Sequence, residues 1–267
     1  MNVKSTRTDI KSKEYFDNII DDYLARAEGL DYNFSSLIFK RRTDIVKDFL
    51  VGIKQRSNLI DFGMGPGLLA DFCIDYGYSY LGIDISPQMV QKAKEKNILN
   101  AKFIVGNTGL LKKYNDTVDV FLAIGLIDYL DKPEEELSVF ADCLKKDGYL
   151  IISFRNNYSL PRILRDLFKY LYQEILTINF KRPNKAFFSN VNEHSFDFST
   201  QLLPLLKSLG FNSFTTKYFN CSPFFFNFPI KPRIWHKWYK LDSQLSREWM
   251  RFFCSGFVVL ANKVSQE

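Results

Sequence analysis

One stretch constrains the fold of this chain more than any other, the glycine-rich segment NLIDFGMGPGLLA at residues 58–70. Its first half is a short apolar run of the kind that a buried parallel strand needs. Three glycines follow at alternate positions and suit a turn that a ligand can approach closely. The apolar residues beyond them begin the inner face of a helix, whose N-terminus would favour an anion at the turn. The residues of this predicted binding turn are Asp61, Gly63, Gly65 and Gly67.

The spacing of the glycines indicates which ligand the turn suits. Dinucleotide sites use G-x-G-x-x-G, but here Leu68 stands three positions after Gly65. The Lys-Ser or Lys-Thr pair of a nucleoside triphosphate loop is also missing after the glycines. The remaining pattern, D-x-G-x-G-x-G after a strand, resembles motif I of the class I S-adenosylmethionine-dependent methyltransferases. The resemblance implies S-adenosylmethionine as the cofactor; a glycine-rich turn without a ligand is the alternative.

The composition is that of a folded globular chain. With 267 residues, 46% of them hydrophobic, it can bury the core of one large domain, or of one domain with an insertion. The four cysteines lack the spacing of a metal site or of a radical centre, so we expect no metal, buried thiols and a reducing, cytoplasmic compartment. We find no signal segment and no run of eighteen apolar residues, and therefore expect no membrane span.

The net charge of +6 is unevenly distributed. Residues 1–154 carry 20 Lys and Arg against 23 Asp and Glu, whereas residues 155–267 carry 16 against 7. The basic character thus belongs to the C-terminal part. It either keeps the surface hydrated or indicates an acidic or phosphate-bearing partner near that part.

Residues 1–56 are predicted to form helices, and the resemblance implies that these helices cover the cofactor. Apolar and aromatic residues recur at intervals of three and four over residues 12–28, and a second helix is expected from about 35 to 50. The segment YFDNIIDDYL, at residues 15–24, is similar to the lid segment of the resembled family, in which a tyrosine approaches the methionine part of the cofactor. Tyr23 matches best and Tyr15 second, while packing in the core is the alternative for both.

Three further strands, at residues 79–84, 102–106 and 118–125, are expected to end beside the glycine turn. Asp84, at the end of the first, can accept hydrogen bonds from both hydroxyls of a ribose, so it should lie close to Gly65. Asn107 stands where the resembled family usually has an aspartate for the adenine amino group. Its amide oxygen accepts that bond with a loss of about 1 kcal/mol, and an ordinary turn residue is the alternative. The cofactor residues assigned to these strand ends are Asp84, Ile85, Asn107, Thr108 and Ile124.

The predicted fold class is α/β, a doubly wound and mostly parallel seven-stranded sheet with an antiparallel terminal hairpin and helical and aromatic insertions. Residues 57–154 are expected to form the core that binds S-adenosylmethionine. Residues 155–267 are expected to belong to the same domain and to carry the acceptor-binding insertions and the last two strands. The remaining strands are expected within 145–154, 211–219 and 251–263, and the remaining helices at 133–146, 160–175 and 199–209.

The segment CSPFFFNFPIKPRIWHKWYKL, at residues 221–241, is dense in aromatic and basic residues. Three interpretations compete. Its aromatic side chains cap the sheet, enclose a ring-bearing or sugar-like acceptor, or make peripheral membrane contact through residues 224–239.

The predicted reaction is O-methylation of a small polar acceptor such as a sugar, a sugar nucleotide or another secondary metabolite. Oxygen is favoured over nitrogen because AIGLIDYL, and not an N-P-P-Y/F tetrapeptide, follows the fourth strand. His194 and Asp128 are the candidate catalytic residues, since a base accelerates transfer to a hydroxyl. The alternative is a surface or capping role for His194 and a helix-start role for Asp128. An RNA methyltransferase and a non-catalytic S-adenosylmethionine-binding protein are the alternative functions. The sequence predicts no oligomeric state.

Overall fold

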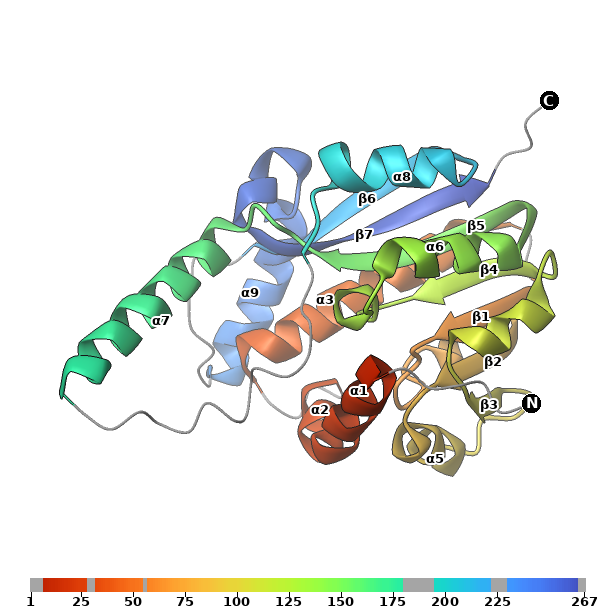
Figure 1. The fold of residues 1–267 in the computed structure, drawn as a ribbon, viewed down its shortest axis with the longest axis horizontal. Coiled ribbons are helices and arrows are strands. Elements are labelled where there is room, and N and C mark those ends of the chain that lie inside the picture. Colours follow the sequence, from red (N-terminus) through yellow and green to blue (C-terminus); the bar gives the residue numbers. More distant parts are fainter. Residues whose placement is uncertain (1–6, 28–31, 55–56, 180–194, 222–229, 264–267) are drawn as a thin grey trace.

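The computed structural model describes residues 7–27, 32–54, 57–179, 195–221 and 230–263, and seven strands of this part form one sheet (Figure 1). Their order is β3-β2-β1-β4-β5-β7-β6. The first five are parallel, and β7 lies antiparallel between β5 and β6. The sheet therefore confirms the predicted fold class. The strands are β1 (Asn58–Phe62), β2 (Ser79–Asp84), β3 (Lys102–Val105), β4 (Val118–Ala123), β5 (Leu144–Arg155), β6 (Phe211–Cys221) and β7 (Cys254–Lys263).

Helices cover both faces of the sheet, and the sequence of β4 shows why. All six of its residues are buried, and the four from Val120 to Ala123 alternate between two cores. Phe121 packs with α6 and α8 on one face, whereas Val120 packs with α3, α4 and α5 on the other. The α-helices are α1 (Arg7–Asn18), α2 (Ile20–Ala27), α3 (Phe34–Gly52), α4 (Ala70–Asp75), α5 (Pro87–Glu95), α6 (Pro133–Cys143), α7 (Leu160–Asn179), α8 (Leu203–Ser208) and α9 (Pro232–Leu245). Shorter helical segments are the 3-10 helices η1 (Thr108–Tyr114), η2 (Ile127–Tyr129) and η5 (Glu248–Phe253) and the π-helix η4 (Phe198–Leu202).

Several predicted helices have different bounds in the structure. The helix expected at 160–175 extends to Asn179 as α7, and the helix expected at 199–209 is divided into η4 and α8. The helix expected over residues 12–28 is broken at Ile19 into α1 and α2. The helix expected to end at Lys146 ends at Cys143 instead, and the lysines after it belong to β5. Lys145 donates from Nζ to Asp119 of β4 at 2.9 Å and forms an ion pair between neighbouring strands.

The second half of the aromatic segment forms α9, which packs against α3. Trp235 is buried, and its Nε1 donates to the carbonyl oxygen of Asn33 at 3.0 Å and to Oγ of Ser36 at 3.1 Å. It is therefore a core residue, and the predicted membrane contact through 224–239 is wrong for this side chain; residues 222–229 lie outside the described part. Within that part, we find no helix with the length and apolarity that a membrane crossing requires.

The expectation of four free thiols is wrong. Cys221 and Cys254 form a disulfide, while Cys73 and Cys143 are free and buried. The pairing follows from tertiary structure, because Cys221 of β6 stands directly opposite Cys254 of β7 in the antiparallel register. The cysteines therefore give no argument for a reducing compartment, and the cytoplasmic location stays a prediction.

Candidate functional site

The turn after β1 has the backbone that its glycines predict. Gly63, Gly65 and Gly67 have φ angles of +76°, +56° and +68°, in the region that favours glycine. A Cβ on Gly65 would lie 3.4 Å from the hydroxyl of Tyr23, and one on Gly67 would lie 3.2 Å from the Cβ of Ala93. Neighbouring elements thus approach the turn closely. The helix that follows, α4, has only six residues and starts beyond the turn, so it contributes less to an anion site than the sequence suggests.

Asp84 lies at the end of β2 in direct contact with the glycine turn. Its oxygens accept hydrogen bonds from the backbone N–H of Gly65 at 2.8 Å and from that of Ser86 at 2.9 Å. The side chain is buried, and burial raises the pKa of Asp84 to about 6. The topology thus brings Gly65 and Asp84 together across parallel strands, as the argument from strand ends predicts.

Asp61, in β1, is buried more deeply than Asp84. Its Oδ2 accepts a hydrogen bond from the hydroxyl of Tyr80 at 2.7 Å. Burial raises the pKa of Asp61 to about 7, the bond from Tyr80 opposes this rise, and the nearby charge of Asp84 adds to it. Asp61 thus has an internal partner on β2 that the sequence analysis did not predict.

The N-terminal helices bring Tyr23 over the glycine turn. Its ring contacts Phe39 of α3 at 5.0 Å and Phe16 of α1 at 6.3 Å between centroids, and Phe16 contacts Tyr129 at 5.4 Å. Burial raises the pKa of Tyr23 to about 12, so the phenol stays protonated and can donate a hydrogen bond. Of the two candidate tyrosines, the structure places Tyr23 at Gly65.

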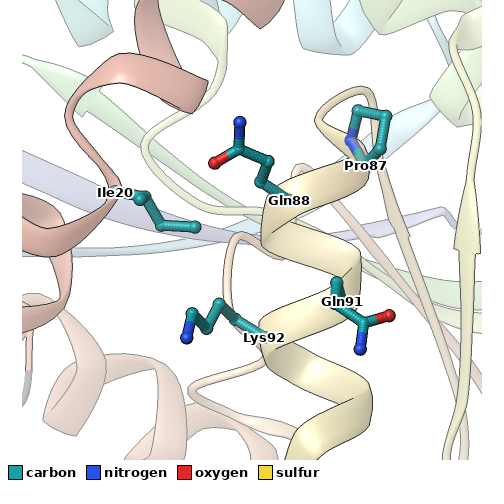
Figure 2. Close-up of a pocket in the computed structure, with 5 residues that line it drawn as sticks. All are labelled: Ile20, Pro87, Gln88, Gln91 and Lys92. Atoms are coloured by element: carbon teal, nitrogen blue, oxygen red, sulfur yellow. The ribbon is translucent and has the colours of Figure 1, made fainter.

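The same helices are attached to the core through α5. Oγ of Ser86, the residue that caps α5, donates to the carboxylate of Asp17 on α1. A crevice of about 280 Å³ lies between α2 and α5 (Figure 2). None of the predicted site residues lines this crevice, whose walls are Ile20, Pro87, Gln88, Gln91 and Lys92.

Arg42 of α3 is a residue of this site that the sequence analysis missed. Its guanidinium lies so close to Gly125 that a Cβ there would be 2.5 Å from Nη1. It also lies over the ring of Phe39, at 5.0 Å from the centroid, and its charge opposes the rise in the pKa of Tyr23. The Nε of Arg42 is buried and has no hydrogen-bond partner among the described residues. Because a buried donor without a partner is costly, this atom points to an anionic ligand.

The other predicted cofactor residues follow their strands. Ile85 comes directly after β2, Asn107 stands at the N-cap of η1 with Thr108 as the first residue of that turn, and Ile124 follows β4. All four are partly exposed. They lie after strands β2, β3 and β4, at the carboxyl edge of the sheet that also carries the glycine turn.

Of the two catalytic candidates, only Asp128 lies in the described part of the chain; His194 lies outside it. Asp128 accepts the backbone N–H of Arg155 at 3.2 Å and pairs with its Nε at 3.4 Å. Burial raises the pKa of Asp128, and the charge of Arg155 opposes the rise. The described residues contain no group of three His, Cys, Asp or Glu side chains that could hold a metal ion.

Comparison with known proteins decides the family. A family model for the methyltransferase domain matches residues 34–213, more than half of the chain. The chain belongs to this methyltransferase family. The ubiquinone biosynthesis O-methyltransferase of Pelagibacter ubique is 27% identical to this methyltransferase over 133 residues, which are 47% of this chain and 55% of the relative. The malonyl-[acyl-carrier protein] O-methyltransferase of Halalkalibacterium halodurans is 32% identical over 103 residues, 36% of this chain and 38% of the relative. The matches thus span about half or less of these curated relatives.

Solved structures of methyltransferases share the fold over nearly the whole chain. The magnesium protoporphyrin IX methyltransferase of Synechocystis PCC 6803, with bound SAH, has a TM-score of 0.63 at 17% identity and covers 95% of this chain and 99% of its own. A SAM-dependent methyltransferase of Thermotoga maritima has a TM-score of 0.58 at 16% identity and covers 94% and 99%. At these identities the likeness concerns the fold, and it confirms the class I methyltransferase sheet.

Proposed function

We propose that this methyltransferase binds S-adenosylmethionine across the carboxyl ends of β1, β2, β3 and β4 and methylates an oxygen atom of a small-molecule acceptor. The observation that carries the proposal is the contact of Asp84 with the glycine turn, where Gly65 donates to its carboxylate at 2.8 Å. Family membership supplies the class of reaction, and the site supplies the groups that would hold the donor.

The residues present fit the parts of this cofactor. Backbone N–H groups, those of Gly65 and Ser86 among them, orient the carboxylate of Asp84, and its remaining lone pairs would accept from ribose hydroxyls. The unpartnered Nε of Arg42 would donate to the methionine carboxylate. The amide oxygen of Asn107 would accept from the adenine amino group. The glycine turn lets the backbone approach all three parts closely.

Catalysis would rest mainly on alignment. When bound, S-adenosylmethionine supplies a methyl group on a positively charged sulfur, and holding the reacting atoms about 3–3.5 Å apart gives much of the acceleration. The rings of Phe16, Tyr23 and Tyr129 would exclude water above the turn. Asp128, oriented by Arg155, is our candidate to position the acceptor or take its proton, with His194 as the second candidate; such a base contributes about 10²–10⁴-fold.

The nature of the acceptor is drawn from the relatives and from the chain after β4. Both curated relatives reported above are named O-methyltransferases, and both are named for small-molecule or acyl-carrier substrates. The sequence AIGLIDYL after β4 also favours oxygen over nitrogen. We therefore propose an oxygen acceptor. A sugar or phosphate group on it stays a prediction from composition.

Asp84→Ala is expected to weaken S-adenosylmethionine binding by about 1–3 kcal/mol, because the ribose loses two hydrogen-bond acceptors. Calorimetric titration of the purified full chain measures this change. Asp75→Ala is the matched control, since that carboxylate is exposed on α4. Unchanged affinity in Asp84→Ala would contradict the ribose assignment.

A methyl-donor consumption assay with pooled phenols, sugars, sugar nucleotides, acyl-carrier substrates and RNA then tests the acceptor class.

Binding is also expected to depend on pH. Ribose hydroxyls donate to the ionised carboxylate, and the pKa of Asp84 is raised to about 6, so affinity should fall about tenfold per pH unit below that value. Calorimetric titration from about pH 8 to 5 tests this effect on binding. Asp84→Asn should bind weakly with no such pH dependence, and a wild-type affinity that is flat across pH 6 would oppose the assignment.

The effect of pH on folding has the opposite sign. Acids whose pKa is raised in the folded state favour folding when they are protonated. The contributions of Asp84 and of Asp61, with its pKa of about 7, to the free energy of unfolding should therefore grow as pH falls from about 8 to 5.

A further inference from the structure

The described part of the chain exposes one concentrated group of large apolar side chains. Sixteen such side chains are exposed among the described residues, and nine of them lie within residues 158–170 and 249–253, with exposed fractions of 41–70%. We call these nine side chains the α7–η5 patch. Its two segments meet, because the rings of Tyr158 and Phe252 are 6.3 Å apart. Scattered apolar residues are normal on a protein surface, whereas a continuous group marks an interaction site.

The helix α7 presents its apolar residues to solvent although it has a clear amphipathic pattern. Leu160, Ile163 and Leu167 recur at intervals of three and four, and each is 41–51% exposed. An amphipathic helix on a globular domain normally buries this stripe against the core. The first turn of the helix is attached to the sheet through Arg162, which donates to the carbonyl oxygens of Asn156 and Ser255. From there α7 runs away from the sheet (Figure 1).

The charge around the patch is positive. Residues 155–179 and 247–253, which contain it, carry six Lys and Arg against three Asp and Glu. Residues 155–267 as a whole carry 16 against 7. The patch also contains Tyr158, Tyr170 and Trp249, the last with 70% of its surface exposed. Amphipathic aromatic rings and long basic side chains are the groups that settle at the boundary between lipid and water.

We infer that the α7–η5 patch docks this protein on the surface of an anionic lipid bilayer. The apolar face of α7, with the aromatic side chains of η5, lies in the headgroup region, and Arg165, Arg247 and Arg251 contact lipid phosphates. The positive excess argues against a second copy of the chain as the occupant, since the same patch on a partner would carry the same charge. It favours a negatively charged plane.

The position of the patch gives this docking a consequence for the enzyme. It begins at Tyr158, three positions after Arg155, whose guanidinium pairs with Asp128. Docking therefore brings the carboxyl end of β5 towards the bilayer. An acceptor that resides in lipid would reach the protein from this side. Docking itself does not depend on the proposed methyl transfer and can be measured without any cofactor.

Co-sedimentation of the full chain with vesicles tests the inference. We expect binding to vesicles with one third phosphatidylglycerol, weaker binding to phosphatidylcholine alone, and a decrease as salt is raised. The double variant Ile163→Ser/Leu167→Ser should partition about tenfold less, because two half-exposed side chains no longer enter lipid. Leu99→Ser is the matched control, since Leu99 is 79% exposed before β3 and should bind as wild type.

Tryptophan fluorescence gives a second measurement that does not depend on variants of α7. Trp235 is 4% exposed and Trp238 is partly buried, so a blue shift of the emission on adding anionic vesicles would come from Trp249. Trp249→Phe should lose this shift and still co-sediment.

Failure of the wild-type chain to bind anionic vesicles, or equal binding by the double variant with its fold intact by circular dichroism, would overturn the inference. So would a dimer in light scattering that the double variant abolishes.

Discussion

Replacement of Asp242 by alanine is expected to lower the free energy of unfolding by about 3–5 kcal/mol. Asp242 lies in α9 with 0% of its surface exposed, and its Oδ2 is 3.0 Å from Nε of Arg41 on α3. Its oxygens also accept the backbone N–H groups of Asn220 at 3.2 Å and Cys221 at 2.6 Å. Alanine leaves a mostly buried guanidinium and two buried N–H groups without their acceptor. Urea denaturation followed by circular dichroism measures the loss.

The chain offers a matched control for this ion pair. Asp48 of α3 pairs with Lys217 of β6 at 3.3 Å, but the two side chains are 65% and 43% exposed. Asp48→Ala should change the free energy of unfolding by no more than about 1 kcal/mol, because exposed pairs gain little from Coulomb attraction in water. Equal losses in the two variants would show that burial of Asp242 does not set its contribution. The comparison also tests whether α9 holds α3, the helix that carries Arg42, in place.

Arg42→Ala is expected to weaken S-adenosylmethionine binding by about 2–5 kcal/mol, which is at least about thirtyfold. The guanidinium lies against Gly125 beneath the N-terminal helices, and its Nε is buried without a partner among the described residues. A ligand carboxylate at this atom would form a charge-assisted hydrogen bond where water is largely excluded. Removing the guanidinium would leave that carboxylate buried and unpaired. Calorimetric titration with the cofactor measures the change.

A cofactor analogue that lacks the carboxylate separates this role from a structural one. Decarboxylated S-adenosylmethionine should bind wild type more weakly than the cofactor does, and Arg42→Ala should not weaken it further. Lys40→Ala, on an exposed face of the same helix, should leave both affinities unchanged. If Arg42→Ala weakens both ligands equally, the residue shapes the site without contacting the carboxylate.

Much of the fold could be predicted because its signals are local. The alternation of short apolar runs with amphipathic segments fixed the order of strands and helices, and parallel strands placed the residues after them at one edge. This reasoning brought Asp84 to Gly65, 19 positions away in the sequence, where the structure has a hydrogen bond of 2.8 Å. The three glycines likewise have the positive φ angles that their spacing suggests.

The residues that sequence reasoning missed depend on contacts between distant segments. Lys40, Arg41 and Arg42 are consecutive and chemically alike, yet each residue of a helix points about 100° away from the previous one. In the structure Lys40 faces solvent, Arg41 binds Asp242, and Arg42 turns towards Gly125. No pattern within α3 distinguishes them, because the partners of the last two lie about 200 and 80 residues further along the chain.

The sequence by itself therefore determined the strand order along the chain, the glycine turn and the acidic strand end beside it, since these follow from periodicity and backbone freedom over a few residues. Only the tertiary structure decided which basic side chain enters the site, that Cys221 faces Cys254, and that α7 leaves its apolar face exposed. The physical reason is that burial, pairing and exposure are properties of a side chain's neighbours, and those neighbours are set by packing across the whole sheet.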